Sequence, residues 1–371
     1  MITKTFFDSI SFSAVERIHS AVLAWIFSLG NKFIGDKEKS DLIKKLLNIE
    51  EKIEFSNFRA YAEVNTIDLL IECDTALFAI ENKLKSSEHS DQTNKMPEKL
   101  IEIASGRNCF YGFLTLIKEQ AKNENVSPIN YEFLYKSLTD LGIVKSENDK
   151  NKNVTRDIIL EYLSTLKNLN RALNEFINNH KTFPKVFIDG GLTKIKKYKK
   201  YSGSNIDTNN LEIIEYIQQN QLETIFQKAF WLNIGLKLAL MSGETFKTDE
   251  SHGTGLIQVY LKECKYLAHT YQISIQWQGK TLKINLADKD YKNSNSMQIT
   301  ETIIGRFQES FANKDGFGNI NPPKKSGGKA YISVTRSMGK EIYEYDQKEL
   351  IEELNFSIRN LRNKLKTFNL D

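Results

Sequence analysis

A pair of short apolar segments constrains this chain more than any other feature of its sequence. IDLLIEC covers residues 67–73 and LFAIENKL covers residues 77–84, so only three residues separate them. Apolar runs joined by so short a connection predict a β-hairpin. Successive side chains of a strand point to opposite faces, and a one-residue slip would therefore exchange the buried set for the exposed set. The register of this hairpin is thus well specified.

The predicted register brings charged side chains together. If Cys73 pairs with Ala76, Asp68 lies directly opposite Glu81, and a four-residue loop that pairs the next residues outward keeps this arrangement. Lys83 stands two positions beyond Glu81 and so shares its face. The same face also carries Leu70, Leu77 and Ala79. We therefore expect it to be partly covered, as when helices pack on both faces of a central sheet.

Two carboxylates held close together in a partly dry site repel each other. Either one of them takes up a proton or a cation joins them. Mg²⁺ and Mn²⁺ prefer oxygen ligands, and Asp68, Glu81 and the main-chain carbonyl of Asn82 can supply several. Lys83 would then face the attacking water or the scissile phosphate and balance the developing charge. The alternative is that these residues form an ordinary cross-strand ion cluster on the surface. Each pair in such a cluster stabilises the fold by only about 0.2–1 kcal/mol.

These residues resemble the PD-(D/E)XK nuclease superfamily, whose core is a helix, three meandering strands, a helix and a final strand. In the segment IDLLIECDTALFAIENK, Asp68 stands at the first metal-binding acid, Glu81 at the second and Lys83 at the lysine. Upstream, Glu16 in VERIHSAVLAWIF looks like the additional acid of many members. Downstream, Gln92 after KSSEHSD matches a glutamine of some branches. Without the resemblance, both would be read as polar residues on helix surfaces.

The sequence departs from the family pattern at two positions. Ile67 replaces the proline of the family name and leaves the acid after it intact. Asn82 takes the usually apolar place between acid and lysine, which weakens the match. The resemblance covers roughly residues 10–120, the rest of the first domain is compatible with it, and the second domain is unmatched.

Length and composition predict two α/β domains. A chain of 371 residues exceeds the usual size of one domain, and the lysine-rich, core-poor segment near residues 190–210 is the best boundary. We therefore expect an α/β nuclease-like domain at 1–200 and an α+β accessory domain at 201–371, serving substrate recognition or oligomerisation. Helices are predicted near 15–29, 40–48, 88–105, 131–141, 154–179, 211–241, 299–311 and from 347, and strands near 55–64, 67–73, 77–84, 109–117, 255–262, 273–277, 282–286 and 329–334.

Basic residues predict where a polyanion would bind. The net charge of +4 is too small to demand such a partner, but seven lysines stand against one acid between residues 181 and 200. The lysines expected to contact a nucleic-acid backbone are Lys85, Lys194, Lys196, Lys197, Lys199, Lys200, Lys324, Lys325 and Lys329. A solvated linker explains the central group equally well.

The cysteines and the apolar runs of the sequence indicate where in the cell we expect the protein. Three widely separated cysteines without a CxxC pair indicate neither a disulfide framework nor a zinc knuckle, and the longest apolar run is too short to cross a membrane. We expect a cytoplasmic protein without a membrane partner.

The resemblance implies a Mg²⁺- or Mn²⁺-dependent nuclease, acting on DNA rather than RNA, in prokaryotic defence against phage, restriction or repair. Two alternatives remain open. One is a nuclease-fold binding module, or a subunit that needs a partner for activity. The other is a structural subunit that forms a homodimer through its C-terminal domain.

Overall fold

The chain forms a mixed α/β structure with two sheets. The computed structural model describes residues 2, 4–10, 14–28, 31, 33–50, 53–88, 91–141, 154–188, 210–251, 253–290, 299–326 and 329–370. Contacts divide the chain into two compact units. The first contains residues 1–175 and 211–225, and the second contains residues 176–210 and 226–371.

This division differs from the single boundary at residue 200 that the sequence predicted. Two of the three changes of unit fall inside helices, α6 (Val154–Asn178) and α10 (Glu223–Ser242), where the sequence has no loop-like signal. The third, between residues 210 and 211, lies at the start of α9 (Leu211–Gln219), next to the segment that the sequence indicated as the boundary. The lysine-rich segment chosen as the boundary, residues 190–209, lies outside the described residues.

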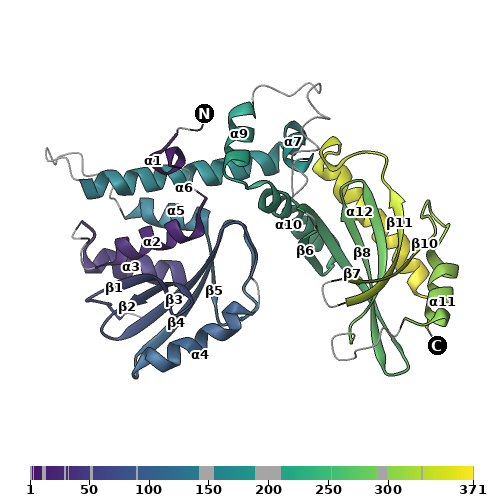
Figure 1. The fold of residues 1–371 in the computed structure, drawn as a ribbon, viewed down its shortest axis with the longest axis horizontal. Helices are drawn as coiled ribbons and strands as arrows, with labels where there is room; N and C mark the ends of the chain where they lie inside the picture. Colours follow the sequence, from purple (N-terminus) through teal and green to yellow (C-terminus); the bar gives the residue numbers. More distant parts are fainter. Residues whose placement is uncertain are drawn as a thin grey trace. The chain divides into compact units, whose positions relative to one another are not determined.

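The first unit is built on a five-stranded sheet in the order β1-β2-β3-β4-β5 (Figure 1). The first three strands form an antiparallel meander, and β4 and β5 continue the sheet in parallel. A helix connects β3 to β4, as a parallel pair requires. The elements are α1 (Phe6–Ser9), α2 (Glu16–Phe27), α3 (Asp36–Leu47), β1 (Arg59–Val64), β2 (Ile67–Glu72), β3 (Ala76–Lys83), α4 (Gln92–Ala104), β4 (Asn108–Thr115), β5 (Ser127–Asn130) and α5 (Tyr131–Asp140).

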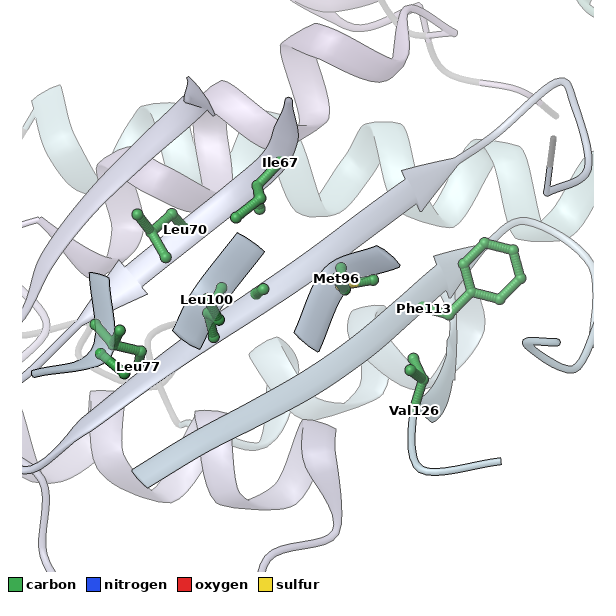
Figure 2. Close-up of a cluster of buried hydrophobic side chains, with 9 residues drawn as sticks. Ile67, Leu70, Leu77, Met96, Leu100, Phe113 and Val126 are labelled. Carbon is green, nitrogen blue, oxygen red and sulfur yellow. The ribbon is translucent and has the colours of Figure 1, made fainter. Parts of the chain in front are cut away.

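Helices cover both faces of this sheet. α2 packs against β1 and β2 on one face, and α4 packs against β3 and β4 on the other (Figure 1). Under α4 lies a cluster of buried side chains from α4 and the strands (Figure 2). Its labelled members are Ile67, Leu70, Leu77, Met96, Leu100, Phe113 and Val126. Leu70 and Leu77 belong to the face of the ionic residues, so the expectation that this face is partly covered is confirmed.

The hairpin of β2 and β3 has the register expected from the sequence. Leu69 pairs with Ile80, and the pairing continues to Glu72 and Leu77. The Cys73 N–H donates to the Ala76 carbonyl at 2.9 Å, which closes the two-residue turn. Most of the buried β2 and β3 residues on the face opposite the ionic residues are aliphatic or aromatic, among them Leu69, Ile71, Phe78 and Ile80, and Asn82 is the polar exception.

The second unit contains a six-stranded antiparallel sheet in the order β10-β11-β9-β8-β7-β6. Leu282, Ile284 and Leu286 occupy alternate positions of β9 and are buried, so one face of the sheet is its core. The remaining elements are η1 (His180–Thr182), α7 (Pro184–Ile188), α9 (Leu211–Gln219), β6 (Phe246–Ser251), β7 (Thr254–Tyr266), β8 (His269–Gln278), β9 (Thr281–Asp288), α11 (Glu301–Phe311), β10 (Ile320–Ser326), β11 (Lys329–Ser337), η4 (Ile342–Glu344) and α12 (Gln347–Leu365).

Several predicted elements differ in detail. The single helix expected over 211–241 is two helices, α9 and α10, separated at residues 220–222, where Gln221 has a positive φ of 54°. The strands β5, β6 and β10 were not predicted, because each is short or polar. No helix among the described residues combines the length and apolar character that a membrane span requires.

Candidate functional site

The hairpin of β2 and β3 brings Asp68, Glu81 and Lys83 into contact. Lys83 Nζ lies 2.7 Å from Glu81 Oε1 and 3.5 Å from Asp68 Oδ2. The ammonium group therefore reaches both carboxylates. The 2.7 Å contact is an ion pair outside hydrogen-bond geometry, so Glu81 Oε1 is buried without a hydrogen bond.

These groups are unequally buried, and both burial and the neighbouring charges shift the pKa values of Glu81 and Lys83. The Glu81 side chain is 2% exposed, against 21% for Asp68. Burial raises the pKa of Glu81 and the charge of Asp68 raises it further, although contact with Lys83 opposes both. Burial lowers the pKa of Lys83, but the two carboxylates outweigh it, so the pKa of Lys83 is raised and the amine stays charged.

Asp68 lies just beyond the end of the β2–β3 ladder. The last pair of the ladder is Leu69 with Ile80, and the Asn82 N–H donates to Asp68 Oδ2 at 2.8 Å. In an antiparallel ladder, the N–H and carbonyl of one residue point toward the same neighbouring strand. The Asn82 carbonyl is therefore directed toward the side of Asp68, where the sequence analysis expected it to act as a metal ligand.

The side chain of Asn82 has a structural task on the opposite face. Its amide nitrogen donates to the Glu16 carbonyl at 2.9 Å and to Ser20 Oγ at 3.1 Å. The Tyr131 hydroxyl donates to Asn82 Oδ1 at 2.8 Å. Tyr131 is completely buried, and this burial raises its pKa far above the usual value, so the phenol stays neutral. Asn82 thus fixes α2 and α5 to the strand that carries Glu81 and Lys83.

Glu16 lies at the end of the same strand. Its Oε1 accepts the N–H of Leu84 at 2.8 Å and that of Lys85 at 3.0 Å, directly after Lys83. Its negative charge also contributes to the raised pKa of Lys83. Glu16 is therefore within electrostatic reach of the cluster and holds the chain where β3 ends.

Glu88, a residue that the sequence analysis did not select, stabilises the start of helix α4. Glu88 is buried, and its Oε1 accepts from both the N–H and the hydroxyl of Thr93, at 3.0 and 2.7 Å. Gln92, the predicted glutamine, is the first residue of α4 and is partly buried. Lys99 of the same helix lowers the pKa of Glu81 by its charge, and it too was missed. Its position one helix away from the hairpin left no sequence signal.

The predicted basic surface is described only in part. Lys85 is described and partly buried beside Glu16. The remaining predicted contacts concern side chains outside the described part of the chain, namely Lys194, Lys196, Lys197, Lys199, Lys200, Lys324, Lys325 and Lys329.

The second unit has a polar groove on the face of its sheet opposite the core. Its volume is about 720 Å³, and amide side chains such as Gln258, Gln272 and Gln276 line it. Its acids outnumber its lysines, because Asp249, Glu250 and Glu263 stand against Lys283 and Lys289. This charge does not favour a polyanion, and the sequence had not indicated the groove.

Comparison of the chain with family models, curated proteins and solved structures gives no significant match.

Proposed function

We propose that this protein is a metal-dependent nuclease with the restriction-endonuclease-like core of the PD-(D/E)XK superfamily. The observation that carries the proposal is the meeting of two carboxylates and one lysine at the end of a covered sheet face, with Glu81 almost fully buried. The order helix, meander, helix, strand supports it. The proposed substrate is DNA rather than RNA, in prokaryotic defence, restriction or repair.

The residues fit a hard divalent cation. Glu81 carries a buried oxygen without a hydrogen bond, Asp68 contributes a second carboxylate, and the Asn82 carbonyl is directed toward Asp68. These three would hold Mg²⁺ or Mn²⁺. When bound, such an ion lowers the pKa of water and stabilises charge on a phosphate.

The chain's own groups have separate roles in this proposal. Lys83 keeps its proton because its pKa is raised, and it would balance the negative charge that develops on the phosphate. Glu16 positions the residues after Lys83 through the two main-chain bonds it accepts. Asn82 holds the strand itself in place from the opposite face.

The test is a nuclease panel of duplex, single-stranded and structured DNA and RNA in Mg²⁺ or Mn²⁺. Wild type should cleave at least one DNA substrate, and Lys83→Ala should fold yet lose turnover. Lys136→Ala is the matched control, because Lys136 forms an exposed ion pair with Glu132 and should leave cleavage unchanged. Wild-type protein that is inert on every substrate would count against the proposal.

A second candidate is a nuclease-fold binding module without activity of its own. The observation that favours it is the ion pair itself, because Lys83 already places a positive charge against both acids. Calorimetric titration with Mg²⁺ separates the two candidates. A nuclease centre gives binding heat in wild type that Asp68→Ala abolishes, whereas a binding module gives none in either protein.

A further inference from the structure

The second unit contains a group of potential metal ligands that is independent of the proposed nuclease centre. His269, Asp288 and Asp290 each offer one ligand atom, and these atoms all lie within 4.8 Å of one another. Among the described residues, no other three histidine, cysteine or acidic side chains meet in this way.

The strand register explains why these three residues meet. β8 pairs with β9 in antiparallel fashion, and Tyr271 lies opposite Asp288 at the end of the ladder. His269 and Asp290 are two positions further along their strands and therefore continue the same face. That face is the core face of β9, so a row of buried aliphatic residues ends in a polar group.

The carboxylate of Asp288 is buried, and one of its oxygens has no hydrogen-bond partner. Its side chain is 0% exposed. Its Oδ1 accepts the Asp290 N–H at 2.9 Å and lies 3.4 Å from His269 Nδ1, whereas its Oδ2 is buried without a hydrogen-bond partner. A buried carboxylate oxygen without a partner is costly, and a bound ion is one of its recognised explanations.

Neighbouring side chains do not supply the missing charge. Lys289 follows Asp288 directly, but its ammonium pairs with Glu263. Tyr271 lies opposite Asp288 and stays neutral, because burial and the charge of Asp288 raise its pKa to about 12. Neither Lys289 nor Tyr271 therefore provides a positive charge to the Oδ2 atom of Asp288.

We infer that His269, Asp288 and Asp290 bind one divalent transition-metal cation at the open ends of β8 and β9. One imidazole nitrogen with carboxylate oxygens suits Zn²⁺ or Mn²⁺ better than Mg²⁺. Donors around one tetrahedral Zn²⁺ lie about 3.5 Å apart, for metal–ligand distances of about 2.0–2.2 Å. The three atoms lie within 4.8 Å of one another, so adjustment of the side chains would close them on an ion. Three protein ligands leave a fourth coordination position open.

The bound ion would also stabilise the sheet. The main chain already joins the strand ends here, since the Thr270 N–H donates to Asp290 Oδ2 at 2.7 Å and the Lys289 N–H donates to the Thr270 carbonyl at 2.9 Å. Bound metal would add a bond between β8 and β9 where their ladder stops. Thermal stability of the full chain should therefore rise with Zn²⁺.

The experiment measures Zn²⁺ bound to the full chain by equilibrium dialysis and elemental analysis. Glu81→Gln serves as the parent, so that the proposed nuclease centre does not contribute a second ion. The parent should bind one equivalent. Adding Asp288→Asn should weaken binding at least about tenfold, whereas adding Asp315→Asn, an exposed acid paired with Lys364, should not change it.

Thermal unfolding with and without Zn²⁺ gives a second readout. Zn²⁺ should raise the Tm of the parent and of the Asp315→Asn control, but not that of Asp288→Asn. If Asp288→Asn does not fold, His269→Gln replaces it, because His269 is partly exposed and glutamine keeps a hydrogen-bond donor beside Asp288. A parent that binds no Zn²⁺, or an Asp288→Asn or His269→Gln protein that binds it as tightly as the parent, would overturn the inference.

Discussion

Lys83 Nζ lies 2.7 Å from Glu81 Oε1 in a place where the glutamate side chain is 98% shielded from solvent. The lysine is thus the nearest positive charge to a carboxylate whose pKa burial raises. A divalent cation that entered here would take over part of this role. The predictions below follow from this competition among a proton, an ammonium group and a metal ion for the same oxygens.

Glu81→Gln should leave the metal-free protein as stable as wild type, or more stable, at neutral pH. The pKa of Glu81 is raised in the folded state from 4.5, so folded protein binds the proton more strongly than unfolded protein. Wild-type stability should therefore fall as pH rises from about 4.5 through the raised pKa, and the glutamine variant should lack this loss. Urea unfolding at pH 4 and pH 7 measures the difference.

Glu132→Gln is the matched control for this pH dependence. Contact with Lys136 lowers the pKa of Glu132, so this residue adds stability above its unfolded pKa and loses it as pH falls. Its exposed i,i+4 pair is worth only about 0.3–0.5 kcal/mol. The two variants should therefore deviate from wild type in opposite directions, and deviations of the same sign would contradict the assigned environments.

Metal affinity should weaken on acidification earlier than an ordinary glutamate would allow. Glu81 must lose its proton before it can bind Mn²⁺, and its pKa is raised. Binding at pH 5.5 should therefore be weaker than at pH 7.5 and should release protons. Calorimetry in two buffers of different ionisation enthalpy counts those protons, and an affinity independent of pH would argue against Glu81 as a ligand.

Two substitutions of Glu16 should separate the effect of its hydrogen bonds on stability from the effect of its charge. Glu16→Ala leaves the Leu84 and Lys85 N–H groups without their acceptor and should cost about 1–3 kcal/mol. Glu16→Gln keeps an acceptor oxygen and should recover most of that loss. Urea unfolding reports both, with Arg17→Ala as an exposed neighbour on the same helix. Equal losses in both Glu16 variants would mean that the charge, not the acceptor, matters for folding.

Asn82 and Tyr131 should be energetically coupled. Tyr131→Phe removes one buried hydrogen bond and should cost about 1 kcal/mol, whereas Asn82→Ala leaves several buried groups unpaired and should cost roughly 2–4 kcal/mol. The double variant should cost less than the sum by about 0.5–3 kcal/mol. A double-mutant cycle by chemical denaturation measures this coupling, and simple additivity would show that the Tyr131 bond is dispensable.

The hairpin could be predicted because residues close together in the sequence determine it. A two-residue connection and alternating side chains determine the pairing, and the pairing alone places Asp68 against Glu81. Glu16 was found through resemblance, and the structure places it against the main chain after Lys83. Which of these residues act in catalysis stays a prediction.

Other features depend on contacts that no local pattern carries. Asn82 was the unexplained polar residue on an apolar face, since its partner Tyr131 comes from a helix about fifty positions away. The group of His269, Asp288 and Asp290 was missed because histidine and acids belong to separate strands with no familiar ligand spacing. Two of the three changes of unit fall inside helices, where composition does not change.

The most direct test of the nuclease proposal is a crystal structure of the full chain with Mn²⁺, examined by anomalous scattering. The account predicts a peak about 2 Å from carboxylate oxygens of both Asp68 and Glu81, with Lys83 Nζ moved away from Glu81 Oε1. A map without a peak between these acids, and with Lys83 Nζ still in its ion pair with Glu81, would contradict it.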